Sequence, residues 1–375
     1  MIDWVIFMKK TGDLLTALLL AGTAALCILA ADTVGAAVYA ALQRCLTAVI
    51  PSLFAMIAVS GLLIRSGTVT AAGRLVHRAG RLLLGMDGDI FLIFLFSNIA
   101  GYPVGARMLI SCYEAGRLTK REAELLAGVC FGAGPAFIYG CIAGQLYRSA
   151  KAGLLISLST ATGSLLCAVV MSVYLRRHGH GAPPRSGVTF SAEMLPDCVS
   201  SAGRAMAEIC AAILGFSVIS AFLIRIGALP AAAELFARLT GREFTTSAGL
   251  ICAALDVTAV GSLPAGDYTL LPAISALVTF GGGCVFMQLA AIYRGKLSLL
   301  PTAVLRLGAA AVSFAACRLL LPLFIAGETV SAAVVTKVHS APSPVPSVLL
   351  AVMTVMVFVK HEKCRAQNID VPIGS

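Results

Sequence analysis

The sequence predicts an all-α, polytopic integral membrane protein, from its composition, its apolar windows and an internal repeat. The chain has 375 residues, of which 59% are hydrophobic and 12% are charged, whereas soluble domains carry about 25% charged residues. Its mean hydropathy is +0.93, so its apolar surface exceeds what one folded core buries. Several windows with few or no charges are long enough, or nearly so, to cross ~30 Å of hydrocarbon as a helix. These windows are 14–31, 49–64, 152–175, 205–224 and 307–325.

Three segments of the first half recur in the second half, which indicates an internal repeat. The clearest pair, SGLLIRSGTVTAA and SAFLIRIGALPAA, matches at an offset of 160 residues. FGAGPAF and FGGGCVF match at an offset of 149 residues, so we expect an 11-residue deletion in the second half, near the equivalent of EAGRLTKREAE. IAGYPVGAR aligns more weakly with AVGSLPAGD. The paired ranges are 60–72 with 220–232, 131–137 with 280–286, and 99–107 with 259–267.

A Gly/Pro-rich segment, RRHGHGAPPRSG, separates the two halves and is typical of a flexible joint. A retained membrane helix is expected before the first half, and a cleaved signal peptide over 1–31 is the alternative. The expected regions are an N-terminal membrane helix in 1–37, the first half in 38–175, a cytoplasmic linker in 176–199, the second half in 200–325, and a C-terminal helix with a basic tail in 326–375.

Each half contains two interrupted apolar segments. SNIAGYPVGAR, at 97–107, places glycine, proline and arginine at the centre of the apolar stretch 89–115. Each arm of that stretch extends only ~16 Å as a helix, too short to cross the membrane, so we predict a re-entrant helical hairpin. A second hairpin is predicted over 246–270. Broken spans are predicted over 119–147, where Thr119 begins a capping box, and over 272–293.

The positive-inside rule orients the chain with both termini inside. Lys9 and Lys10 place the N-terminus inside, and about eight full spans then bring the basic C-terminus, KHEKCR, to the same side. Most of the 28 Lys and Arg residues then lie inside, which accounts for the net charge of +10. The two halves have opposite orientations, so the repeat is inverted. The basic stretch TAAGRLVHRAGRLLLG fits either a helix at the membrane interface or a solvated loop helix.

Several function classes find no support in the sequence. No basic run is interleaved with aromatic residues, so nucleic acid is not an expected partner. The 12 cysteines are scattered without a CxxC pair, and the 5 histidines fall in predicted loops or at ends, so we expect no disulfide and no metal site. We expect no enzyme and no bound cofactor, and a coupling cation, Na⁺ or H⁺, stays open.

The interruptions form the candidate site. Unwound backbone at membrane depth is tolerated where it is buried or lines a polar cavity, and matching interruptions in inverted halves indicate a transporter's midplane site. Arg107 is the candidate partner of an anionic substrate group, and an ion pair with Asp256 or Asp267 is the alternative. Arg306 and Arg318 are expected to snorkel or to pair structurally. The expected substrate-binding residues are Asn98, Gly101, Tyr102, Pro103, Arg107, Gly132, Gly134, Asp256, Thr258, Gly281, Gly282 and Gln288.

The run GYPVGARMLISCYEAGRLTKREAELLAGVCFGAGPAFIYG, at 101–140, resembles the YlbJ-type sporulation integral membrane proteins of the nucleoside-recognition, or Gate, domain superfamily. FGGGCVFMQ, at 280–288, continues the resemblance more thinly. The resemblance implies a core similar to that of concentrative nucleoside transporters, with two hairpins and two unwound helices around substrate and sodium. It also implies a role in endospore formation, moving dipicolinic acid through the mother-cell-derived outer forespore membrane.

We therefore expect a secondary-type transporter of a small anionic metabolite in a bacterial cytoplasmic membrane, with dipicolinic acid as the leading substrate. A nucleoside transporter is one alternative. A non-transporting membrane scaffold or assembly factor in sporulation is another. The expected partners are the small anion and the lipid bilayer, and a homo-oligomer stays open, as do the coupling ion and the direction of transport.

Overall fold

The computed structural model describes residues 21–22, 24–25, 28–85, 87–178, 188–191 and 193–325. Within these ranges every regular element is a helix and there is no strand, which confirms the predicted all-α class. The predicted first span, 14–31, lies mostly outside the described residues, and the predicted last span, 347–360, lies entirely outside them. Much of the predicted linker, 176–199, also lies outside them.

Four of the described helices are long and apolar enough to cross a membrane. A fifth span results if Leu53–Arg65 and Thr68–Leu82, which are bent by 81° at a short break, are counted together. Two shorter apolar helices, Gly88–Ala100 and Phe244–Leu255, fall in the first arms of the two predicted hairpins. The four long helices are Ala150–Arg176, Met194–Arg225, Tyr268–Tyr293 and Leu300–Ile325.

In chain order the helices are α2 (Ala31–Arg44), η1 (Cys45–Val49), α3 (Ile50–Arg65), α4 (Thr68–Leu84), α5 (Gly88–Ala100), α6 (Val104–Glu114), α7 (Lys120–Val129), α8 (Pro135–Phe137), η2 (Ile138–Tyr147), α9 (Ala150–His178), α10 (Met194–Arg225), α11 (Ala228–Thr240), α12 (Phe244–Leu255), η3 (Val257–Ser262), η4 (Tyr268–Leu270), α13 (Leu271–Phe280), α14 (Gly282–Tyr293) and α15 (Leu300–Ile325). The elements η1 and η2 are π-helical, and η3 and η4 are short 3-10 helices.

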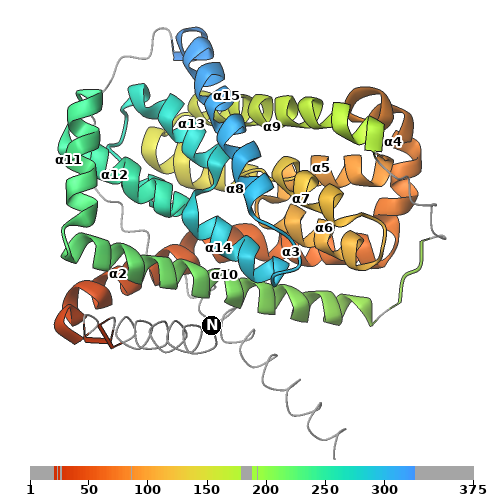
Figure 1. The fold of residues 1–375 in the computed structure, drawn as a ribbon, viewed down its shortest axis with the longest axis horizontal. Helices are drawn as coiled ribbons and strands as arrows, with labels where there is room; N and C mark the ends of the chain where they lie inside the picture. Colours follow the sequence, from red (N-terminus) through yellow and green to blue (C-terminus); the bar gives the residue numbers. More distant parts are fainter. Residues whose placement is uncertain are drawn as a thin grey trace, which may run out of the picture.

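The long helices form two opposite edges of the molecule. α2, η1 and α3 run on as one helix, because the residues that join them keep helical backbone angles. α10 packs along α2 and α3, and these helices lie together along the lower edge in Figure 1. Along the upper edge α9 packs against α15, and α13 packs against both. The shorter helices lie between these two edges.

The strongest sequence repeat has the same local structure in both halves. α3 ends at Arg65 and α10 ends at Arg225, and in each half a glycine two residues later precedes the next helix. Gly67 has a φ of 74° and Gly227 a φ of 79°, where residues with a Cβ meet steric strain. In both halves this glycine N–H donates to the carbonyl three residues earlier, at 3.1 Å.

The helices that follow these glycines, α4 and α11, lie at opposite ends of the molecule (Figure 1). Each runs across the direction of α9 and α10 in that view. α4 exposes Leu75 and Leu82, at 88% and 75%, and α11 exposes Leu239, at 76%. The two expectations for the basic stretch, a helix at the membrane interface and a solvated loop helix, stay predictions.

The second half is shorter than the first in more than one place. α11 has 13 residues where α4 has 17. After α12 the chain returns as the six-residue η3 and irregular backbone, whereas after α5 it returns as the 11-residue α6. The second predicted hairpin therefore has only one α-helical arm, and the prediction of a single deletion near the charged connection is wrong.

The two predicted broken spans are interrupted to different extents. α7 ends at Val129 and the next helix begins at Pro135, with irregular chain between them. α13 and α14 are separated only by Gly281, and the pair counts as one span. The predicted capping box at the start of α7 is confirmed, because Thr119 Oγ1 accepts from Glu122 N at 3.3 Å and the Glu122 carboxylate accepts from Thr119 N at 2.8 Å.

Candidate functional site

α5 and α6 form a two-helix turn whose base is fixed by an ion pair. Asp89, in the first turn of α5, bonds to Arg117, which follows α6. Arg117 also donates to the Thr70 hydroxyl of α4 at 3.5 Å. The base of this turn therefore lies at the α4 end of the molecule. Its tip, around Gly101, lies toward the centre.

The second turn, formed by α12 and η3, is closed at the opposite end. Arg242, which precedes α12, donates to the hydroxyl and to the carbonyl oxygen of Thr269, both at 3.4 Å. Tyr147, at the end of η2, donates to the Asp267 carbonyl at 3.0 Å. This base adjoins α11, which packs on α12, so the two turns approach the centre from opposite ends. Their re-entrant course through a bilayer stays a prediction, as do the span count and the orientation.

The tip of the first turn packs directly on the break after α7. A Cβ placed on Gly134 would lie 3.0 Å from the Ile99 carbonyl oxygen and 3.2 Å from the Gly101 nitrogen. A Cβ on Gly101 would lie 3.1 Å from the Gly134 nitrogen. Two stretches of backbone are therefore in contact here, and a side chain at either glycine would push the tip and the break apart.

The second half repeats this contact. A Cβ on Gly282 would lie 3.1 Å from the Val257 nitrogen and 3.3 Å from the Ala253 carbonyl oxygen. Val257 begins η3 and Ala253 lies in the last turn of α12, so this glycine packs on the tip of the second turn. In each half, therefore, the tip of a turn packs against the Gly-rich break of the same half.

One cavity, which we call the junction cavity, lies where the tips and the breaks meet. Its volume is about 50 Å³, which holds a few water molecules. Both tips, both broken spans, α3 and α10 contribute to its wall, which is mostly apolar with a few polar groups, as is usual for ligand sites. The lining residues are Val49, Leu53, Gly101, Tyr102, Ala133, Gly134, Phe137, Ile209, Ile213, Asp256, Val257, Thr258, Cys284, Val285 and Gln288.

Two neutral polar side chains of the wall are poorly satisfied. The Tyr102 hydroxyl is buried and has no hydrogen-bond partner among the described residues. A buried hydroxyl without a partner costs about 1–3 kcal/mol, so this group is available to a ligand. Gln288 is also buried, and its amide nitrogen lies 3.5 Å from the Cys284 sulfur, which is a weak acceptor.

Asp256 is the carboxylate of the wall, and its side chain is only 7% exposed. It caps η3, because its Oδ1 accepts from Thr258 N at 3.0 Å and its Oδ2 accepts from Thr258 Oγ1 at 2.7 Å. Arg44 Nη2, on α2, lies 3.5 Å from Asp256 Oδ2. Arg44 Nε is buried and has no partner among the described residues. A guanidinium with an unused N–H donor therefore lies beside Asp256, which is a residue of the cavity wall.

The structure brings half of the predicted site residues into the wall of the junction cavity. Asn98 is not among them, because its amide nitrogen donates to the Phe94 carbonyl within α5 at 2.8 Å and its side chain abuts Gly132. Pro103, Gly281 and Gly282 also lie outside the wall and shape the tips and breaks beside it. The predicted residues that line it are Gly101, Tyr102, Gly134, Asp256, Thr258 and Gln288.

Arg107 lies outside the junction cavity, in contrast to its expected place. Its Nη2 donates to Glu208 Oε2, on α10, at 2.8 Å. Its acidic partner is therefore neither Asp256 nor Asp267, which was the alternative. Asp267 instead caps η4 by accepting from Thr269 N at 2.9 Å.

Arg306, on α15, is fully buried, so of the two expectations for this residue snorkelling is wrong and a structural pairing is confirmed. Its Nε and Nη2 donate to the Thr279 carbonyl at 3.0 and 2.6 Å, and its Nη1 donates to the Gly128 carbonyl at 3.3 Å. Thr279 and Gly128 lie in the last turns of α13 and α7, the helices that precede the two breaks. Each helix C-terminus carries about half a negative charge, so two of them together offset the guanidinium charge.

Phe131 connects Arg306 to the junction cavity. The Arg306 guanidinium carbon lies 4.8 Å from the centroid of the Phe131 ring, within the range of cation–π attraction. Phe131 also stacks on Tyr102, with 5.0 Å between the ring centroids, and on Phe286, with 6.2 Å between them. This stack holds the Tyr102 ring and thereby fixes where its hydroxyl lies.

The arrangement suits the binding of a small polar molecule. A phenol, a carboxylate, an amide and a hydroxyl face an otherwise apolar space, which is how binding sites orient a ligand. Among the described residues, no three or more His, Cys, Asp or Glu side chains are grouped to hold a metal ion.

The chain is similar to the sporulation integral membrane protein YlbJ of Bacillus subtilis. The two are 28% identical over 129 residues, which cover 34% of this chain and 32% of YlbJ, so the match spans about a third of each protein. No family model matches the chain, and no solved structure matches it significantly. The similarity and the long apolar helices together identify an integral membrane protein.

Proposed function

We propose that this protein is a secondary-type transporter of a small anionic metabolite, and that its substrate is dipicolinic acid during endospore formation. The junction cavity carries this proposal, because the tip of a turn and a Gly-rich break from each half line one shared space. Interrupted helices at membrane depth persist where they surround a cavity. In secondary transporters with repeated halves, such a cavity holds the substrate.

We propose an anionic substrate because of Arg44. Its guanidinium contacts Asp256 of the cavity wall and keeps an unused Nε–H donor. A planar guanidinium binds a carboxylate through two parallel hydrogen bonds. The contact with Asp256, at 3.5 Å, is long for a charge-assisted hydrogen bond, so a substrate carboxylate competes for the same guanidinium. Among small carboxylates we propose dipicolinic acid, because the chain is similar to a sporulation protein and its segment 101–140 resembles the YlbJ-type proteins.

Transport requires the junction cavity to enlarge, since about 50 Å³ holds only a few waters. In this proposal one turn, α5–α6 or α12–η3, moves away from the glycine on which its tip packs and admits the substrate from one side. The other turn then withdraws and releases it to the opposite side. The described arrangement, with both tips seated, is the closed state between these two steps.

Asp256 is our candidate for coupling to a cation. It is a buried carboxylate beside the ends of interrupted helices, and such groups serve Na⁺ or H⁺ in transporters. Neutralising its charge with either cation frees Arg44 for the substrate, so cation and anion would bind together.

A nucleoside is the second candidate, because the wall itself contains no Lys or Arg. Tyr102 and Phe137 offer aromatic faces, and Thr258 and Gln288 offer a hydroxyl and an amide. These groups suit a neutral ring that carries several hydroxyls. Asp256 would then accept hydrogen bonds from the sugar.

Uptake into proteoliposomes separates the candidates. The purified full-length protein is reconstituted, and uptake of labelled dipicolinate is compared with uptake by protein-free vesicles. Uptake that unlabelled dipicolinate blocks and uridine does not block supports the proposal. Uridine uptake without dipicolinate uptake selects the nucleoside. If a folded protein takes up neither compound, the transporter proposal fails and a membrane scaffold or assembly factor is favoured.

A further inference from the structure

A second, larger cavity lies one helical turn beyond the junction cavity. Its volume is about 330 Å³, and we call it the vestibule. On α3, Leu53 lines the junction cavity and Ile57 lines the vestibule; on α14, Gln288 lines the first and Ile292 the second. A spacing of four residues is about one turn of a helix. The two cavities therefore follow one another along the same helices.

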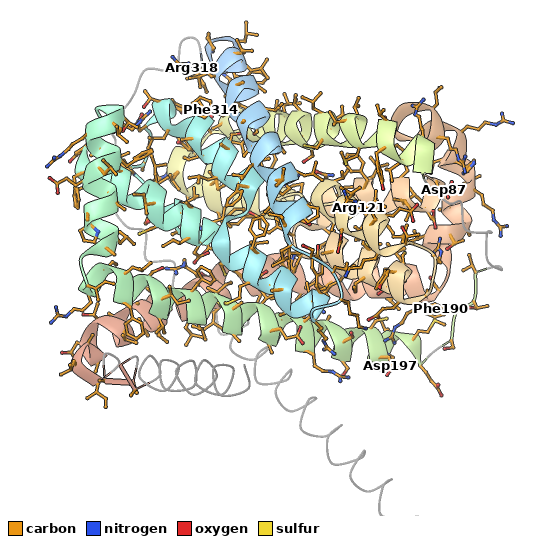
Figure 2. All side chains as sticks on the ribbon, viewed as in Figure 1. Asp87, Arg121, Phe190, Asp197, Phe314 and Arg318 are labelled. Atoms are coloured by element: carbon orange, nitrogen blue, oxygen red, sulfur yellow. The ribbon has the colours of Figure 1, made fainter. Side chains whose placement is uncertain are left out.

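The vestibule lies toward the α4 end of the molecule. Arg65, the last residue of α3, belongs to its wall and pairs with Asp197 of α10 at 3.6 Å. Figure 2 places Asp197 at the end of α10 that faces the α4 side of the molecule. The orientation predicted from the positive-inside rule makes this the cytoplasmic side.

Arginines from three separate segments line the vestibule. Arg65 comes from α3, Arg107 from α6, and Arg294 from the residue after α14. The wall also contains Glu114 and Glu208. Positive charges gathered in a cleft between low-dielectric walls raise the local concentration of anions.

The acidic groups of the vestibule are already paired. Glu114 accepts a bond from Lys296 at 2.5 Å, so its charge is balanced from outside the wall. Glu208 is paired with Arg107, and its side chain is 46% exposed. An ion pair this exposed contributes little to stability. An incoming anion can therefore take the place of the Glu208 carboxylate.

Arg107 also has an unused donor. Its Nη2 binds Glu208, but its Nε is buried and has no partner among the described residues. A guanidinium binds an anion best through two neighbouring N–H groups. Arg107, a residue of the vestibule wall, therefore keeps one N–H donor that no described group uses.

We propose that the vestibule is a receiving site for small anions that carry carboxylate or phosphate groups, and that the Arg107–Glu208 pair is the point where such an anion passes toward the junction cavity. This inference rests on the proposed function and deepens it. Arg107 belongs to α6, the arm of the first turn, and Glu208 belongs to α10. An anion that replaces Glu208 as the partner of Arg107 therefore breaks a contact between α6 and α10. This contact holds the α5–α6 turn, which must move away for the junction cavity to open.

Fluorescence quenching tests the vestibule without a transport assay. The single tryptophan, Trp4, is replaced by Phe, and a reporter is introduced in the vestibule wall as Ile292→Trp. Ile64→Trp provides a second reporter in the same wall in case the first variant fails to fold. Quenching by iodide, an anion, is divided by quenching by neutral acrylamide, both measured at low ionic strength. Both quenchers depend on how accessible the reporter is, so their ratio reports the effect of the local charge on the anion.

We expect Arg107→Gln and Arg65→Gln to lower the iodide-to-acrylamide ratio about two- to threefold, and Glu208→Gln to raise it by a similar factor. Arg238→Gln is the matched control, because Arg238 forms an exposed ion pair with Glu234 on α11, at the opposite end. A ratio that is unchanged in the vestibule variants, or changed equally in the control, overturns the proposal. Inorganic phosphate should compete with iodide in the parent and not in Arg107→Gln.

The same variants separate this inference from the proposed function. If the parent protein shows the iodide preference but takes up no dipicolinate, the vestibule stands and the proposed substrate is wrong. If dipicolinate is taken up equally by the parent and by Arg107→Gln, and the iodide ratio is also unaffected, the transporter stands and the vestibule is wrong.

Discussion

Arg306 donates two hydrogen bonds to the carbonyl oxygen of Thr279, at 2.6 and 3.0 Å, from a fully buried position. The same guanidinium also reaches the Gly128 carbonyl and the Ser164 hydroxyl, each at 3.3 Å. Helix α15 thereby holds the last turns of α13 and α7, one in each half. Because those turns precede the two breaks, a single side chain positions both halves of the junction cavity.

Replacing this side chain should destabilise the whole protein. We expect Arg306→Met to lower the free energy of unfolding by about 2–4 kcal/mol, because the Thr279 and Gly128 carbonyls lose their donor in a buried site. Thermal unfolding of the purified protein in detergent measures this. Arg318→Met is the control, since Arg318 is exposed on the same helix (Figure 2). Equal unfolding temperatures for the two variants would contradict the capping role.

Removing the hydroxyl of Tyr102 should weaken substrate binding. We expect Tyr102→Phe to raise the KM for uptake about two- to tenfold, the range that corresponds to the loss of one hydrogen bond. Tyr293→Phe is a closely matched control, because the Tyr293 hydroxyl is also buried without a partner among the described residues but does not line the junction cavity. If both variants lose uptake equally, the effect is one of folding and not of the cavity.

Neutralising Asp256 should alter the dependence of uptake on a cation gradient. Asn retains the ability to cap η3, so Asp256→Asn should fold, but it loses the charge that faces Arg44. We expect uptake driven by an imposed pH or Na⁺ gradient to fall about tenfold or more, because one charge is lost from a buried site. Asp267→Asn is the control, because Asp267 caps η4 in the same way but does not line the junction cavity. Gradient dependence that survives in Asp256→Asn would remove this residue from coupling.

Adding a methyl group at the contact between tip and break should unseat the first turn. Gly134→Ala places a Cβ 3.0 Å from the Ile99 carbonyl oxygen, and crowding of backbone in a packed interior costs about 1–3 kcal/mol. Gly140→Ala, in the following helix, meets nothing within 4 Å and serves as the control. The two variants are compared by thermal unfolding and by uptake. Equal stability for both would mean that the break yields without strain.

Local sequence patterns predict most of the helices correctly. The apolar windows 152–175, 205–224 and 307–325 fall within α9, α10 and α15, because a run of apolar residues of membrane length is a strong signal by itself. Thr119 and Glu122 likewise predict the start of α7 correctly, because a capping box depends only on residues that are neighbours in the sequence. The shortened return after α12 carries no comparable local signal.

The candidate site could be predicted only where its residues interrupt an apolar run. Glycine, proline and charged residues in such a run are visible in the sequence, and they locate both tips and both breaks. Apolar members of the wall, such as Ile209 and Val49, look like any other membrane residue. Arg44 lies 212 positions from its partner Asp256, so neither residue identifies the other in the sequence.

By itself the sequence determines an all-helical membrane protein with repeated halves and the places where its helices are interrupted, because hydropathy and glycine are local properties. Only the tertiary structure decides which group each buried charge meets. It places Asp256 beside Arg44 and Arg306 on the ends of α7 and α13. The reason is physical: in a low-dielectric interior a charge must find a partner, and that partner is whichever helix end or side chain the packing brings within reach.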